Sequence, residues 1–190
     1  MIIKYKNEHL VDIGPPLDYS FKQYTSIKDV IVDAPRTSRV GRMPTITAAN
    51  KYFSRAIWLN NNKLTNMQYI NDLVKRCLHD PMKLGWLDIS YNFIPEIDVM
   101  LAKLQSLSIL YLHGNLISNI DQVLRLYPLK NLKSVTFHGN PISESPEYRT
   151  YVTTYLPQVR TLDFSAITLL EQHMPKPADA VKKLAAAREK

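Results

Sequence analysis

Histidines and aspartates are the residues of this sequence whose types and spacing could do chemistry. His113 and His138 each lie two residues before an asparagine, and two histidines at matching positions of adjacent strands could share a metal ion. No third ligand accompanies them, so we expect no metal site. Asp88 and Asp163 fall at least two repeating segments apart, which is too far for a general acid and base to act together.

Other catalytic arrangements are missing from the sequence. The five glycines form no G-x-G-x-x-G loop for a phosphate, and neither G-x-S-x-G nor H-E-x-x-H occurs. The single cysteine, Cys77, falls on the apolar face of an expected helix and is interpreted as a core residue. We therefore expect a protein with no enzymatic activity and no cofactor.

Aromatic residues mark a candidate binding surface. They alternate with aliphatic residues along short segments, so that they point outward from strands whose neighbours lie about 4.8 Å apart. An exposed apolar cluster of this kind usually binds a partner. The expected protein-binding residues are Trp58, Trp86, Asp88, Ile109, Tyr111, His113 and His138. The alternative is that Tyr19 and Phe21 fold over these rings.

An eleven-residue pattern, L-x-x-L-x-L-x-x-N-x-L, positions these residues. It occurs in SRAIWLNNNKL (54–64), LGWLDISYNFI (84–94), LSILYLHGNLI (107–117) and LKSVTFHGNPI (132–142). Its spacing, except for the first interval, lies within the about 20–29 residues of leucine-rich repeats. The amide side chain of the asparagine can bond backbone groups that no strand pairs. We expect such an asparagine ladder at Asn62, Asn92, Asn115 and Asn140.

The fold class predicted is α/β, a right-handed leucine-rich-repeat solenoid with a parallel sheet on its concave face and helices or turns on its convex face. Residues 51–168 comprise four repeats and a C-terminal cap, with VRTLDFSAIT (159–168) as a degenerate last turn. Apolar spacing predicts helices over 67–78 and 148–156. Residues 1–50 form an extension that packs on the first repeat, with a basic loop at 34–45 and a short helix at 26–32. Residues 169–190 are expected to be a basic tail with a short, exposed helix.

The charge is mildly basic and evenly spread. The chain of 190 residues is 45% hydrophobic and 22% charged, with a net charge of +7. One stretch without acidic residues contains a set of basic residues: Arg36, Arg39, Arg42, Lys51 and Arg55. They form a solvated loop, contact an acidic protein surface such as tubulin tails, or bind nucleic acid, and the even charge favours the first two. With one cysteine and no apolar run of about 18 residues, the sequence favours the cytoplasm and no membrane.

The sequence also resembles a known class of proteins. FHGNP (137–141) and YRTYVTTYLPQVRTLDF (148–164) are similar to the end of the intracellular leucine-rich-repeat class with a C-terminal cap. This class includes the axonemal dynein leucine-rich light chain and a spliceosomal protein that holds an RRM partner. PPLDYSF (15–21) extends the resemblance beyond the repeats. The resemblance implies an adaptor of the ciliary or flagellar axoneme, and the alternative it implies is a ribonucleoprotein-binding protein that holds an RRM partner.

Overall fold

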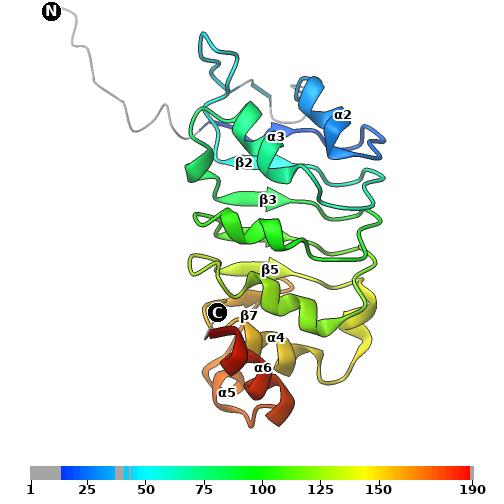
Figure 1. Ribbon diagram of the computed structural model, residues 1–190, viewed down its shortest axis with the longest axis vertical. Helices are drawn as coiled ribbons and strands as arrows, with labels where there is room; N and C mark the ends of the chain where they lie inside the picture. Colours follow the sequence, from blue (N-terminus) through cyan, green and yellow to red (C-terminus); the bar gives the residue numbers. More distant parts are fainter. Residues whose placement is uncertain (1–13, 37–40, 43, 189–190) are drawn as a thin grey trace, which may run out of the picture.

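Seven strands of the described chain form one sheet. The computed structural model describes residues 14–36, 41–42 and 44–188. The strands cross the sheet in sequence order, and β1 to β6 are parallel neighbours (Figure 1). They are β1 (Leu17–Asp18), β2 (Ala56–Trp58), β3 (Trp86–Asp88), β4 (Ile109–Tyr111), β5 (Ser134–Thr136), β6 (Thr161–Leu162) and β7 (Ser165–Ala166). Each turn of the chain thus adds one parallel strand, which confirms the predicted α/β solenoid.

The second layer consists of helices that connect the strands and of two helices that follow the last strand. The α-helices of the described residues are α2 (Ile27–Val32), α3 (Ile70–Cys77), α4 (Tyr148–Tyr155), α5 (Leu169–His173) and α6 (Ala178–Arg188). Four further connections among the described residues are 3-10 helices: η1 (Pro81–Lys83), η2 (Val99–Lys103), η3 (Ile120–Leu126) and η4 (Pro141–Glu144). The predicted helices over 67–78 and 148–156 are present as α3 and α4.

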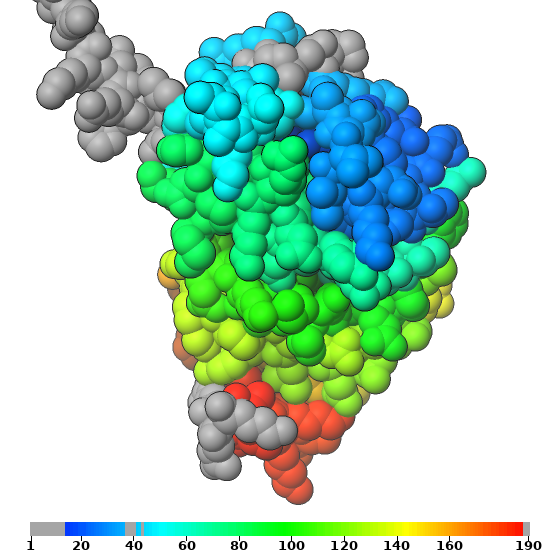
Figure 2. Space-filling model, turned by 45° about the horizontal axis from the view of Figure 1, so that its top comes forward, coloured from blue at the N-terminus to red at the C-terminus, as the bar shows by residue number. Residues whose placement is uncertain are grey.

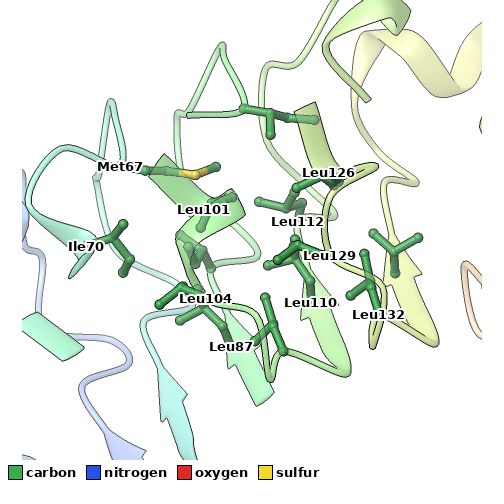
Figure 3. Packing of buried hydrophobic residues seen from close by; sticks show 14 of the residues in the cluster. Met67, Ile70, Leu87, Leu101, Leu104, Leu110, Leu112, Leu126, Leu129 and Leu132 are labelled. Atoms are coloured by element: carbon green, nitrogen blue, oxygen red, sulfur yellow. The ribbon is translucent and has the colours of Figure 1, made fainter. Parts of the chain in front are cut away.

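The core lies between these two layers. The middle residue of each strand from β2 to β5 points inward, and Leu87 and Leu110 are fully buried. They meet buried side chains of the helical layer, including Leu101 of η2 and Leu126 of η3 (Figure 3). Burying a leucine stabilises a fold by about 1.5–3 kcal/mol. The repeated leucines therefore account for the stacking of successive turns.

Four asparagines hold the turns together where the strands end. The Nδ2 group of Asn115 donates to the carbonyl oxygen of Leu112 in its own turn and to that of Ile89 in the preceding turn, both at 3.0 Å. Its Oδ1 accepts from the N–H of Ile94 at 3.1 Å. The same two-turn pattern recurs at the other members of the ladder, Asn62, Asn92 and Asn140. The ladder satisfies buried backbone groups that the strands leave unpaired.

The residue before each ladder asparagine has left-handed backbone. The φ angles are 55° at Asn61, 51° at Tyr91, 66° at Gly114 and 69° at Gly139. Only glycine adopts this conformation without steric cost. At Gly114 space is short as well, because an added Cβ would approach Cδ1 of Tyr91 to 2.6 Å. The tight turn is thus a shared feature of the repeats.

The N-terminal segment forms a further turn of the solenoid. Its strand β1 pairs with β2 in parallel, and Leu17 and Tyr19 are fully buried. Helix α2 packs beside α3, and Figure 2 shows this blue segment seated against the cyan and green turns. Arg36 forms an antiparallel bridge with Asp18 of β1. Its backbone N–H donates to the carbonyl oxygen of Asp18 at 2.6 Å. These contacts cover the strand edge that the first repeat would otherwise expose.

The C-terminal end differs from the expectation in two ways. β7 runs antiparallel to β6, because the chain reverses at Asp163 and Phe164, which have φ angles of 51° and 62°. The expected helix is present as α6, but it is not simply exposed: Ala180 is fully buried and Leu184 is 7% exposed. Helix α6 packs on α4, and its Lys183 forms an ion pair with Asp121 at 2.7 Å. The tail therefore completes the cap.

Candidate functional site

The sheet face away from the helices, here called the concave face, is built from aligned side chains. The strand registers place Trp58, Asp88, Tyr111 and Thr136 in one row. Trp86 and Ile109 lie in the adjacent row, between Ala56 and Ser134. Alternation along each strand turns these side chains away from the core. The structure thus brings together the aromatic residues that the repeat pattern predicted to share a face.

Four rings on this face touch in sequence. The ring centroids of Trp58 and Trp86 lie 5.3 Å apart, those of Trp86 and Tyr111 5.8 Å, and those of Tyr111 and Phe164 5.2 Å. Each contact is edge to face, a favourable geometry for aromatic pairs. Trp58, Trp86 and Tyr111 are half-buried, whereas Phe164 is 58% exposed. This aromatic row spans the face from β2 to the C-terminal hairpin.

Phe164 is a member of the row that the repeat pattern does not predict. The degenerate last turn (159–168) lacks the asparagine that aligns one strand with the next, so the repeat pattern does not predict where Phe164 points. The β6–β7 turn places Phe164 over the concave face. Its ring centroid lies 5.6 Å from that of His113 and 5.6 Å from that of His138. Neither Asp163 nor Phe164 is a glycine, so residue type gave no signal for the reversal.

Tyr19 does not cover the aromatic row. Its side chain lies in the core on the opposite side of the sheet, where its hydroxyl is 3.4 Å from Sγ of Cys77. Cys77 is itself buried, which fits the predicted core role and raises the pKa of its thiol. Phe21 is 48% exposed and lies beyond the end of β1. The alternative in which Tyr19 folds over the rings is therefore wrong.

The two histidines stack on each other beside the row. The rings of His113 and His138 are 4.5 Å apart with 12° between their planes, and Nδ1 of His113 lies 2.8 Å from Oγ1 of Thr136. Burial, followed by the neighbouring His138, lowers the pKa of His113 to about 4. Among the described residues no group of three metal-ligating side chains occurs. Only 8% of His113 is exposed, so this residue, predicted to contact a partner, packs instead against His138 and Thr136.

Asp163 closes the end of the sheet. Its Oδ1 accepts the backbone N–H groups of Phe137 and His138 at 2.7 and 2.9 Å. Its Oδ2 accepts the hydroxyl of Tyr148 at 2.8 Å, and burial together with this carboxylate raises the pKa of Tyr148. The carboxylate of Asp163 thus satisfies backbone and side-chain donors just beyond the end of β5, which is a structural role.

Asp88 is the carboxylate that the concave face holds among its rings. The N–H and Oγ–H of Ser90 donate to its Oδ1 at 2.9 and 2.6 Å. Burial raises the pKa of Asp88, and the two hydrogen bonds from Ser90 oppose that effect. Burial also raises the pKa of Tyr111, with the charge of Asp88 as a further cause. A partly desolvated negative charge therefore lies within the aromatic row.

The basic residues that the sequence predicted to form one surface differ in their exposure and contacts. The guanidinium of the half-buried Arg36 donates to the carbonyl oxygen of Phe21 at 2.7 Å, so it ties the N-terminal segment together. Arg42 and Arg55 are exposed and Lys51 is half-buried. Arg39 lies outside the described residues.

None of the described helices combines the length and the apolar character that crossing a membrane requires.

Comparisons with known proteins agree with this architecture. A family model for the leucine-rich repeat matches residues 20–188. The leucine-rich repeat-containing protein 51 of Rattus norvegicus is 43% identical over 154 residues, covering 81% of this chain and 79% of the relative. The Homo sapiens protein of the same name is 40% identical over the same share of each chain.

One more distant relative and one solved structure also match. A probable U2 small nuclear ribonucleoprotein A' of Caenorhabditis elegans is 37% identical over 86 residues, covering 45% of this chain and 33% of the relative. The crystal structure of the Drosophila melanogaster SNF/U2A' complex matches with a TM-score of 0.53 and 23% identity, covering 78% of this chain and 75% of that one. This last likeness concerns the fold. By the family match and the curated relatives, the chain belongs to the leucine-rich-repeat family and, within it, to the group of leucine-rich repeat-containing protein 51.

Proposed function

We propose that this chain is a non-enzymatic adaptor that holds a protein partner on its concave face. The observation that carries the proposal is the aromatic row of Trp58, Trp86, Tyr111 and Phe164. Trp58, Trp86 and Tyr111 project from strands, so their rings lose little conformational freedom when a partner binds. Large aromatic side chains at the centre of an interface commonly provide most of its affinity. Membership in the leucine-rich-repeat family supports a role in protein interaction.

The proposed place of this adaptor is the cytoplasm, in the axoneme of a cilium or flagellum. The support is the resemblance of the C-terminal cap to a class that includes an axonemal light chain. The exposed Arg42 and Arg55 offer positive charge for a second contact, with the acidic tails of tubulin or with a microtubule-associated complex. In this proposal the concave face binds the partner and the basic residues contact the surrounding assembly.

A ribonucleoprotein role is the second candidate. It is favoured by the 37% identity to a U2 small nuclear ribonucleoprotein A' over 86 residues. In this alternative the concave face would hold an RRM partner, and the protein would be found in the nucleus.

Cell fractionation separates the two candidates. Tagged protein in ciliated or flagellated cells is expected in the axonemal fraction, with partners that remain bound after extraction of soluble proteins. The matched control is a double variant, Trp86→Ala with Tyr111→Ala, which should lose those partners. A nuclear protein that co-purifies with RRM proteins would instead support the second candidate.

A further inference from the structure

The concave face lacks the positive charge that the rest of the chain carries. The sequence has 24 lysines and arginines against 17 aspartates and glutamates. The outward positions of β1 to β6 in the described chain include no lysine or arginine. They are Asp18, Ala56, Trp58, Trp86, Asp88, Ile109, Tyr111, Ser134, Thr136 and Thr161. A face with this composition on a basic protein favours a cationic partner group.

Asp88 marks the part of the concave face that would bind a cationic group. Its strand register places it between Trp58 on β2 and Tyr111 on β4, and Trp86 lies two residues before it on the same face. The ring of Trp86 contacts those of both Trp58 and Tyr111, at 5.3 and 5.8 Å. Three aromatic rings therefore gather around one carboxylate.

One oxygen of this carboxylate is available. Oδ1 of Asp88 is occupied by the two hydrogen bonds from Ser90. Oδ2 of Asp88 accepts no hydrogen bond from any described residue, and it is not closed off from solvent. Oδ2 of Asp18, by contrast, has no hydrogen bond and is buried. No basic side chain of the described residues pairs with Asp88, whereas Asp33 and Asp121 pair with lysines. Within the part of the chain that the structure describes, the carboxylate of Asp88 thus has hydrogen bonds from Ser90 but no cationic partner.

We propose that Trp58, Trp86, Tyr111 and Asp88 form a recognition site for an arginine side chain of the protein partner. The inference rests on the proposed function and specifies its chemistry. Aromatic faces attract a cation, and a carboxylate at their base would accept its N–H groups. A guanidinium suits this site better than an ammonium, because it is planar, stacks on rings and is more weakly hydrated.

Intrinsic fluorescence tests the proposal directly, because Trp58 and Trp86 are the two tryptophans of the sequence. The full chain is titrated with the tripeptide Ac-Gly-Arg-Gly-NH2 at constant ionic strength. The same peptide with citrulline, which has the shape of arginine without its charge, serves as the ligand control. We expect a saturable change with arginine and a response at least about tenfold weaker with citrulline.

Two variants with the same charge change test the role of the carboxylate. Asp88→Asn retains an oxygen that can accept from Ser90, so the fold should persist, as thermal unfolding will verify. It should weaken arginine binding at least about tenfold. Asp72→Asn, at an exposed carboxylate on α3, should leave arginine binding unchanged.

Several results would overturn the arginine site. They are no saturable response to the arginine peptide, equal responses to arginine and citrulline, a lysine peptide that binds as tightly, or full binding by a folded Asp88→Asn variant. These failures differ from failure of the proposed function. If Trp86→Ala and Tyr111→Ala release the cellular partner but the arginine tests fail, the concave face binds a partner of other chemistry. If those variants keep the partner, the proposed function itself fails.

Discussion

The hydroxyl of Tyr19 and the thiol of Cys77 lie 3.4 Å apart inside the core, although 58 positions separate them in the sequence. The contact joins the N-terminal segment to helix α3. Because both residues are buried, this segment behaves as a turn of the solenoid and helps to hold its first repeat.

Loss of this packing should destabilise the whole chain. Replacing Tyr19 by alanine removes a fully buried ring and should lower the free energy of unfolding by about 3–5 kcal/mol. Tyr19→Phe keeps the ring, so it should cost less than about 1.5 kcal/mol. Deleting residues 1–50 should lower the thermal midpoint or cause association. Urea unfolding measures the two variants, and a deleted chain that stays monomeric with an unchanged midpoint would contradict the packing role.

The asparagine ladder makes a separate prediction. Asn115→Ala leaves the N–H of Ile94 and the carbonyls of Ile89 and Leu112 without their side-chain partner. The expected loss in the free energy of unfolding is about 1–3 kcal/mol. The exposed Asn131→Ala serves as the control and should change stability by less than about 0.5 kcal/mol. Equal effects of the two substitutions in chemical denaturation would argue against the ladder.

His113 should make stability depend on pH. The unfolded chain binds a proton at this residue near pH 6.5, whereas burial and His138 hold the pKa of the folded state at about 4. The folded state therefore binds this proton less readily, and its contribution to stability is lost as the pH falls from 6.5 toward 4. NMR of the imidazole resonances should show His113 titrating near pH 4. A midpoint near pH 6.5 would contradict its burial.

The repeat pattern predicted much of the concave face because two simple periodicities determine it. Alternation along a strand sets which side chains face outward, and the recurring asparagine aligns one strand with the next. These rules place Trp58 near Trp86 and Trp86 near Tyr111. They also predict the convex helix α3 from its apolar spacing.

The C-terminal end of the solenoid is harder to predict. The chain reversal at Phe164 has no marker in residue type, because a nonglycine residue there takes a left-handed conformation. The burial of α6 was missed for another reason. Ala180 and Leu184 have the four-residue spacing of a packed helix face, but the many charged residues of the tail suggested exposure.

The central claim is that the partner binds the aromatic row, and one comparison of variants tests it most directly. Trp86→Ala and Tyr111→Ala should each weaken binding of the partner recovered with the native chain by at least about 2 kcal/mol, or roughly thirtyfold. Their thermal midpoints should stay close to that of the native chain, because both side chains lie outside the core. Gln68→Ala and Lys75→Ala, at exposed positions of the helical layer, should bind as the native chain does. Native affinity in both aromatic variants, with binding lost in the Gln68 or Lys75 variant, would place the partner on the opposite face.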